Sequence, residues 1–171
     1  AVFRPAAIWG SRACAEELAA TAEHQLRQVE RTIADRPTTS RLLAGGHRLD
    51  RPGWYFAPTV VADVAQGDAI VQSEVFGPVA TVQAFRDEDE AVALANGTPF
   101  GLAASVWTRD QGRAQRMAGR LDVGCVWVNT HLALVAEMPH GGVKHSGYGR
   151  EGSSLALDDF TRTKHVMAAH R

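Results

Sequence analysis

Cysteine is scarce in this 171-residue chain: it occurs only at Cys14 and Cys125, far apart in the sequence and with no CxxC pair. Two such cysteines form neither a disulfide framework nor a zinc-binding pattern, and they are typical of a protein from a reducing compartment. An excess of positive charge is also missing, because 18 lysines and arginines stand against 19 aspartates and glutamates. This balance argues against binding to nucleic acid or to an anionic membrane surface.

Long apolar runs are missing too. No stretch approaches the roughly 20 residues that a membrane-spanning helix needs. The N-terminal residues Ala-Val-Phe-Arg-Pro, which do not begin with methionine, lack the basic start and the apolar stretch of a secretion signal. We therefore expect a cytoplasmic protein without a membrane partner. The length and the 45% hydrophobic content predict one domain with a real core.

Strands and helices are predicted to alternate in the middle of the chain. Three segments have the composition of strands: residues 79–85, 102–108 and 125–129. Asp87 and Asp110 stand where N-caps are expected, and Glu90 adds a capping-box-like start to the first helix. These helices should end near Asn96 and Leu121. The order predicts an α/β fold with a parallel-sheet core and flanking helices.

Weaker patterns lie towards both ends of the chain. Apolar residues recur at steps of three and four from Leu18 to Ile33, which predicts a helix over residues 11–35 that Pro37 ends. Four further elements are expected: short strands at 41–44 and 55–61, a short helix at 151–159 and a last strand at 161–168.

Residues 130–150 form a long segment, rich in glycine and histidine, that has no periodicity; such loops are usually functional. The segment leads into Gly147-Tyr-Gly149-Arg-Glu-Gly152, a literal G-x-G-x-x-G. The dinucleotide fingerprint requires a strand directly before the glycines and an acid on a second strand about 20 residues later. A loop precedes these glycines, and too little chain follows them. We therefore interpret them as tight turns.

Side chains that could act as nucleophiles or metal ligands lack the partners they need. The histidines of this segment have no cysteine or clustered carboxylate nearby, so no metal site is predicted. Ser146 does not stand on the strand-to-helix turn of a nucleophile elbow. Cys125 precedes a predicted buried strand and is interpreted as a core residue, and Cys14 has no histidine partner in sequence. No catalytic residue is predicted in this chain.

Four motifs, in this order and spacing, carry a family resemblance. They are Gln72-Ser-Glu-Val-Phe-Gly-Pro78, Asn96-Gly-Thr-Pro-Phe-Gly-Leu-Ala-Ala-Ser-Val-Trp-Thr108, Gly124-Cys-Val-Trp-Val-Asn129 and Pro139-His-Gly-Gly-Val-Lys-His-Ser-Gly-Tyr-Gly-Arg-Glu151. From about Thr21 to Ala168 the chain resembles the C-terminal part of the aldehyde dehydrogenase superfamily. Around residues 129–142 it is most similar to the aminoaldehyde branch, in particular 4-aminobutyraldehyde dehydrogenases. The resemblance implies three parts: an unassigned segment (1–20), a partial catalytic domain (21–160) and a C-terminal oligomerisation strand (161–171).

The chemistry of that family gives several residues an implied role. A cysteine thiolate attacks the aldehyde, hydride passes to the nicotinamide of NAD, and a glutamate activates the water that releases the acid. Glu74 matches the carboxylate that binds the nicotinamide ribose, and Phe76 matches the aromatic beside the nicotinamide ring. Without the motif, Glu74 would be interpreted as a solvated loop acid and Phe76 as a core residue. Asn129 matches a structural asparagine at the end of a core strand.

Substrate-tunnel positions of the family match five residues of the long segment: His131, Leu132, Leu134, Glu137 and His140. Glu137 would offer its charge to an ammonium-bearing aldehyde. The family's cysteine, its general-base glutamate, its oxyanion asparagine and its dinucleotide-binding domain all precede the Glu74 motif by more residues than this chain has there. Cys14 lies too close and lacks a Gly-Gln-x-Cys setting. Residues 8–12 weakly resemble the segment after the nucleophile, which would place Ala7 at the cysteine position.

Two functions remain open. The chain is either a fragment of an NAD-dependent aldehyde dehydrogenase or a truncated, catalytically silent interaction and oligomerisation module derived from that family. In both cases we expect the chain alone to be inactive and to bind no NAD. The expected partners are a second copy of the chain or the missing N-terminal half, with a small aldehyde bound only when the site is completed. An upstream in-frame Gly-Gln-x-Cys motif would favour the first function.

Overall fold

The structure is a computed structural model that describes residues 23–170. The chain forms two compact units, which divide between Leu94 and Ala95. The sequence predicts one domain, whereas the structure gives each unit its own strands and helices. Residues 1–20, and with them Cys14 and Ala7, lie outside the described part of the chain.

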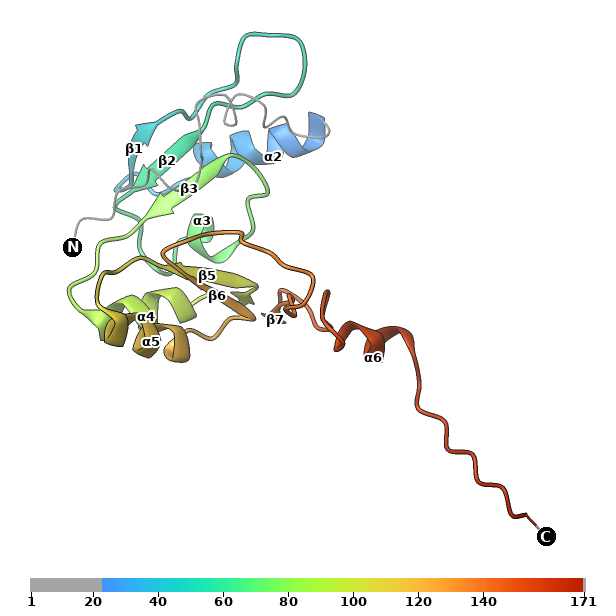
Figure 1. Ribbon diagram of the computed structural model, residues 1–171. Coiled ribbons are helices and arrows are strands. Elements are labelled where there is room, and N and C mark those ends of the chain that lie inside the picture. The colour runs from blue at the N-terminus through green and yellow to red at the C-terminus, as the bar shows by residue number, and fades with distance from the viewer. Residues whose placement is uncertain (1–22, 171) are drawn as a thin grey trace. The chain divides into compact units, whose positions relative to one another are not determined.

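The first unit is built on a three-stranded sheet (Figure 1). Its elements are helix α2 (Glu23–Ala34), strands β1 (Arg41–Ala44) and β2 (Thr59–Ala62), helix α3 (Ala69–Gln72) and strand β3 (Val79–Val82). Strand β1 lies antiparallel to β2, and β2 runs parallel to β3. The sequence predicts β1 and an extended segment at 55–61, but it does not identify β2 as the hydrogen-bonded partner of β3.

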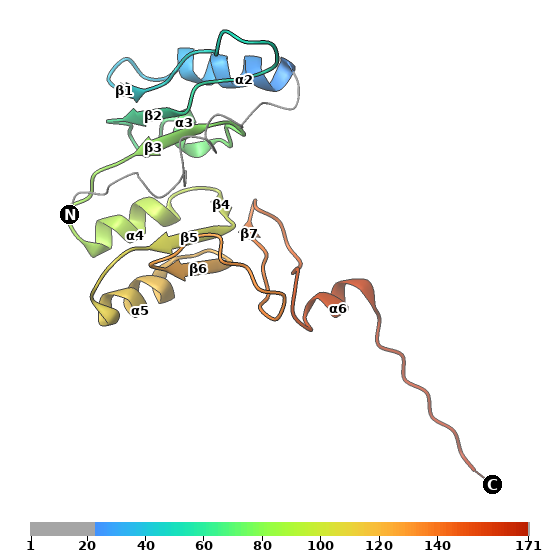
Figure 2. The ribbon, with the colours of Figure 1, turned by 45° about the horizontal axis from the view of Figure 1, so that its top comes forward.

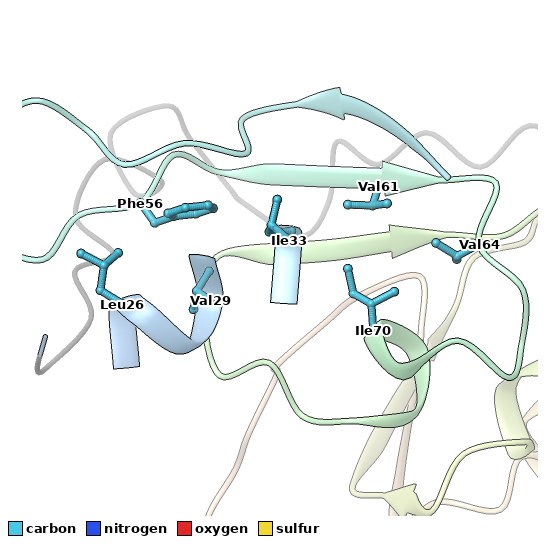
Figure 3. Close-up of a cluster of buried hydrophobic side chains, with 7 residues drawn as sticks. All are labelled: Leu26, Val29, Ile33, Phe56, Val61, Val64 and Ile70. Atoms are coloured by element: carbon cyan, nitrogen blue, oxygen red, sulfur yellow. The ribbon is translucent and has the colours of Figure 1, made fainter. Parts of the chain in front are cut away.

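One face of α2 supplies much of the core of this unit. Leu26, Val29 and Ile33, spaced by three and four residues as predicted, are buried. Four more apolar side chains complete the cluster in Figure 3: Phe56, Val61, Val64 and Ile70. Removing these side chains from water holds the helix against the sheet. The predicted N-terminal turns of this helix, from Ser11, lie outside the described residues.

Helix α4 (Glu88–Asn96) ends the first unit and continues into the second, which centres on two parallel strands (Figure 2). The elements of the second unit are β4 (Phe100–Gly101), β5 (Ala103–Val106), α5 (Gln111–Arg120), β6 (Cys125–Val128), β7 (Val143–Lys144) and α6 (Ala156–Phe160). Strands β5 and β6 pair in parallel through the α5 crossover, as predicted, and β4 pairs antiparallel with β7. The predicted α/β class, with parallel strands and helical connections, is confirmed. The prediction that residues 79–85 share one parallel core with β5 and β6 is wrong, because β3 pairs with β2 in the sheet of the first unit and β5 and β6 form a sheet of their own.

Both aspartates that were predicted to start helices do so. Asp110 Oδ1 accepts a hydrogen bond from the Arg113 N–H (2.9 Å), and Asp87 Oδ1 accepts one from the Glu90 N–H (2.9 Å). Glu90 Oε2 accepts from the N–H of Arg86 (2.6 Å), one residue before the cap. The guanidinium of Arg86 binds the same oxygen at 3.0 Å. The capping box of α4 is therefore displaced by one residue from its predicted position.

The C-terminal segment differs from the prediction. Residues 161–170 contain no assigned strand and are exposed throughout; Figure 1 shows them leading away from α6 as an extended tail. A strand needs a neighbour for its backbone hydrogen bonds, and none of the described strands pairs with this segment. The predicted helix at 151–159 is shorter, because α6 begins only at Ala156. Among the described residues, no helix has the length and apolarity that crossing a membrane requires.

Candidate functional site

The loop between α3 and β3, residues 73–78, is fixed to the core of the first unit. Val75 packs against the apolar cluster. The backbone of Gly77 passes so close to α2 that a Cβ there would lie 2.5 Å from Val29 Cγ2. Between them, the Phe76 carbonyl accepts a hydrogen bond from Gln25 Nε2 (2.7 Å). The loop is therefore attached at three consecutive residues.

These attachments leave the side chain of Phe76 uncovered. Phe76 has a φ of 52°, and it is 68% exposed in its unit, so it is not the core residue that its apolar character alone would predict. Glu74, two residues earlier, is exposed as well. A carboxylate and an uncovered aromatic ring thus stand on one short, fixed loop. This combination suits ribose hydroxyl groups, which donate to a carboxylate, and a flat nicotinamide ring.

Asn129 fastens the end of β6 to the end of β5. Its backbone N–H donates to the Val106 carbonyl (2.8 Å). Its side-chain amide binds the Thr108 backbone twice, accepting from the N–H (2.8 Å) and donating to the carbonyl (2.9 Å). With a φ of 55°, Asn129 also turns the chain out of the sheet, which asparagine tolerates better than most residues. These contacts hold the ends of the two strands together, so Asn129 has a structural role.

Trp127 is the centre of the contacts that hold the loop after β6. Its indole N–H donates to the Ala133 carbonyl (2.9 Å). The His131 ring meets the indole in a T-shaped contact with centroids 5.4 Å apart, and the His140 ring stacks on it at 6.1 Å. Nδ1 of His131 also lies 2.6 Å from Ser105 Oγ. The structure thus brings two of the predicted substrate residues together on one tryptophan.

The other predicted substrate residues stand on the same loop without such contacts to the tryptophan. Leu132, Leu134 and Glu137 are exposed. His140, by contrast, closes the loop, because its backbone exchanges hydrogen bonds with Glu151 at 2.8 and 2.7 Å. Its Nδ1 is buried and has no hydrogen-bond partner. The loop is therefore held at both ends and carries its apolar tip into solvent.

Two residues of this arrangement were missed by sequence reasoning: Ser105 and Trp127. They are directly opposite each other in the parallel register of β5 and β6. The sequence signal was available in principle, because aligning the two predicted strands would have paired them. Cys125, on the same strand as Trp127, is partly buried, and this burial raises the pKa of its thiol. A raised pKa lowers the thiolate fraction, which fits the predicted role as a core residue.

The glycine-rich segment behaves as turns, as predicted. Gly147, Gly149 and Gly152 have φ values of 103°, 85° and 69°, which side chains with a Cβ rarely adopt. Arg150 steadies the segment by donating to the carbonyls of Gly142 (3.0 Å) and Gly149 (2.6 Å). A hollow of about 470 Å³ adjoins it, and its lining includes His140, Tyr148, Asp159 and Phe160. In the described part of the chain, no three potential metal-ligating side chains gather.

Known proteins match most of the chain. The model of the aldehyde dehydrogenase family matches residues 17–166. A succinate-semialdehyde dehydrogenase [NADP(+)] from Deinococcus radiodurans is 50% identical over 127 residues, covering 74% of this chain and 27% of that protein. Betaine aldehyde dehydrogenase 1 from Rhizobium meliloti is 47% identical over 130 residues, with 74% and 27% covered. The chain thus spans less than a third of the length of these curated relatives.

Solved structures agree with the fold. A betaine aldehyde dehydrogenase from Staphylococcus aureus in complex with NAD+ superposes with a TM-score of 0.81 at 37% identity, covering 86% of this chain and 31% of that one. An indole-3-acetaldehyde dehydrogenase from P. syringae, also in complex with NAD+, gives a TM-score of 0.82 at 40% identity, with 85% and 30% covered. Both chains contain much that has no counterpart in the 171 residues.

Proposed function

Because the chain belongs to the aldehyde dehydrogenase family, we propose that it is the C-terminal part of an NAD-dependent enzyme that oxidises an aldehyde to a carboxylic acid. It supplies a cofactor-binding loop (residues 73–78) and a substrate-binding loop (residues 129–140, the loop after β6), while the nucleophile and the dinucleotide-binding domain come from the rest of the enzyme. The observation that carries the proposal is the fixed 73–78 loop with Glu74 and Phe76 exposed on it. The chain alone is inactive in this proposal, since no thiolate is available to attack the aldehyde.

The residues of the 73–78 loop fit NAD. The carboxylate of Glu74 accepts hydrogen bonds from two adjacent ribose hydroxyl groups, and the ring of Phe76 packs beside the nicotinamide. When bound, NAD supplies the acceptor for the hydride that leaves the substrate. The role of this chain is to orient the nicotinamide end, and the fixed backbone of the loop limits the rotation of that end. The NAD+ complexes of the structural relatives support the proposal of NAD, whereas the succinate-semialdehyde relatives are named for NADP(+).

An aminoaldehyde is the proposed substrate class. Residues 129–140 contain one carboxylate, Glu137, and no lysine or arginine. A cationic end of the substrate would find an opposite charge there, whereas a carboxylate end would meet repulsion. The relatives that act on betaine aldehyde, by their names, support a cationic substrate. The succinate-semialdehyde relatives define the competing class, which carries an anionic end.

A chimera tests this function directly. In it, the present chain replaces the matching C-terminal segment of the S. aureus betaine aldehyde dehydrogenase, which supplies the remainder of an enzyme. We expect NAD-dependent oxidation of 4-aminobutyraldehyde by the chimera and none by the chain alone. Glu74→Gln should raise the KM for NAD, and Glu137→Gln should raise the KM for the aminoaldehyde but not for acetaldehyde.

Three results would contradict the proposal. Turnover by the 171 residues alone would show that a nucleophile within residues 1–22 has been overlooked. A folded chimera that is inactive with every aldehyde, beside an active parent enzyme, would remove the enzymatic assignment. A preference of the chimera for succinate semialdehyde would overturn the substrate class alone. Intact mass and N-terminal sequencing of the natural protein complete the test by showing what accompanies this chain.

A silent association module is the second candidate, and the C-terminal tail favours it. Val166 and Met167 are 75% and 84% exposed on an extended segment that no described strand pairs with. Unpaired extended backbone next to apolar side chains is a template for pairing with another chain. We propose a second copy of the chain as that partner. Light scattering over a dilution series should then show a dimer or larger species that Val166→Lys dissociates, while a strict monomer would refute it.

A further inference from the structure

Trp127 makes more contacts to the substrate-binding loop than a core side chain requires. It is 7% exposed and lies in β6 opposite Ser105. If filling the core were its whole role, any large apolar side chain would suffice at position 127. The indole N–H, however, donates its single hydrogen bond to the carbonyl of Ala133, a residue of the loop itself. The contact joins the sheet to the point where the loop has turned back.

The loop returns to Trp127 because of two left-handed residues. Asn129 and Leu132 have φ values of 55° and 54°, so the chain reverses direction just after β6. This reversal places His131 against the indole and within 2.6 Å of Ser105 Oγ. The paired strand positions 105 and 127 thus form one platform, on which the imidazole of His131 has two contacts that fix its position and its plane.

His140 reaches the same indole from the other end of the loop. Its ring stacks on Trp127 with an interplanar angle of 30°, and its backbone is tied to Glu151 on both sides. Its buried Nδ1 has no hydrogen-bond partner, so this nitrogen does not fix the imidazole. Stacking on Trp127 is therefore the side-chain contact that we take to set the orientation of the ring.

We propose that Trp127 is a positioning residue that sets the orientation of His131 and His140 and so the shape of the substrate-binding loop. It does so without touching the aldehyde, through one hydrogen bond and two ring contacts. The inference rests on the proposed function only in the statement that this loop binds the aldehyde. The arrangement of the rings is a property of the chain itself and is measurable without any catalysis.

The test compares three tryptophan variants of the 171-residue chain. Trp127→Phe keeps a ring and removes the donor, Trp127→Leu removes both, and Trp107→Phe is the matched control at an exposed tryptophan near the same strands. NMR of histidine-labelled protein reports the ring signals of His131 and His140, which the indole ring current displaces. Hydrogen exchange at the Met138 amide, which donates to Val135, reports opening of the loop.

We expect Trp127→Phe to preserve displaced histidine signals and to speed Met138 exchange about fivefold, the equivalent of one lost hydrogen bond. Trp127→Leu should return both histidine signals towards those of free imidazole. Trp107→Phe should change neither readout. Ser105→Ala should shift His131 alone, and it keeps the test sharp if the leucine variant fails to fold.

The proposal is overturned if Trp127→Phe leaves the exchange of the Met138 amide unchanged, because the loop would then keep its shape without the indole donor. Loss of the indole ring current shifts the histidine signals of Trp127→Leu in any case, so that variant reports the ring contacts and not the shape of the loop. It is also overturned if loop exchange rises only in step with global unfolding, because Trp127 would then be a core residue alone. In the chimera, Trp127→Phe should raise the KM for the aldehyde several-fold and leave kcat nearly unchanged. An inactive chimera with the expected NMR result would refute the proposed function and leave the positioning role intact.

Discussion

The two loops that carry the candidate site residues are held in different ways. The 73–78 loop is attached mainly through its backbone: a carbonyl is bound by Gln25, Gly77 is in close contact with Val29, and only the Val75 side chain packs on the core. The loop after β6 is closed by backbone hydrogen bonds between His140 and Glu151, and in addition two of its contacts depend on side chains, the amide of Asn129 and the indole of Trp127. Backbone attachment tolerates a change of the exposed side chains. Side-chain attachment ties the shape of the loop to residue identity, so substitutions there should alter specificity most readily.

Deleting a core side chain beneath the 73–78 loop should have the largest effect on the free energy of unfolding. Leu26→Ala deletes a fully buried side chain from the cluster on α2. We expect a loss of about 2–5 kcal/mol in the free energy of unfolding, because the cavity is only partly filled by relaxation. Urea denaturation followed by circular dichroism measures it. Arg27→Ala on the exposed face is the control, and a similar loss in that variant would contradict the assigned packing.

The close approach of Gly77 gives a direct test of backbone attachment. Gly77→Ala places a Cβ 2.5 Å from Val29 Cγ2, and the buried valine has little room to move. We expect a destabilisation of about 1–3 kcal/mol, typical of overpacking, and a raised KM for NAD in the chimera. Val29→Ala alone should also destabilise the chain, because it deletes buried methyl groups. The double variant should lose less than the sum of the two single losses, since the clash is removed. Additive effects of the two changes would show that this contact does not hold the loop.

Local signals in the sequence predicted the parts of the fold that depend on neighbours in sequence. The caps at Asp87 and Asp110 and the buried face of α2 are of this kind, because a turn of helix fixes them. The β5–β6 pair also followed, since a helix between two strands brings them parallel. Pairing of β2 with β3 was missed, as the chain between them has no long crossover helix to indicate it.

The site was predictable only in part, and for a related physical reason. Motifs predicted roles for the residues at 74, 76, 131 and 140, which stay predictions, but Trp127 resembled an ordinary strand residue. Its role depends on a register opposite Ser105 and on two left-handed turns that return the loop. Such information is not contained in spacing. Likewise, a strand at 161–168 was expected from its composition, yet extended structure becomes a strand only when another strand pairs with it.

Side-chain attachment of the second loop is tested at Asn129. Asn129→Gly keeps the left-handed turn accessible and removes both amide hydrogen bonds to Thr108, so it isolates them. We expect a loss of about 1 kcal/mol, as for exposed hydrogen bonds, and faster exchange of the Met138 amide. Asn129→Asp keeps the acceptor but turns a carboxylate oxygen towards the Thr108 carbonyl, and it should cost more than glycine. If Asn129→Gly were as stable as the wild type, the amide hydrogen bonds would not contribute, and the left-handed turn alone would end β6.

The smallest expected effect concerns helix α5, which connects β5 to β6, the two strands that pair Ser105 with Trp127. The hydrogen bond from the Arg113 N–H lowers the pKa of Asp110 below its ordinary value of 3.8. Because the folded pKa is the lower one, the stabilisation is fully present above the unfolded pKa. It is lost as the pH falls through the folded pKa. Since Asp110 is exposed, its contribution to the free energy of unfolding is small, and only the sign of the pH dependence is predicted.

Asp110→Ala and Asp110→Asn separate the cap from its charge. The difference in urea midpoint between wild type and Asp110→Ala should stay constant from neutral pH to about pH 5 and shrink towards pH 3, where the carboxyl begins to take up a proton. Asp110→Asn caps the helix without titrating, so its midpoint should not share this pH dependence. If the wild-type advantage over alanine persists unchanged at the lowest pH, the charge is not what stabilises the start of α5. The hydrogen bond that Asp110 accepts from the Arg113 N–H would then account for the cap without its charge.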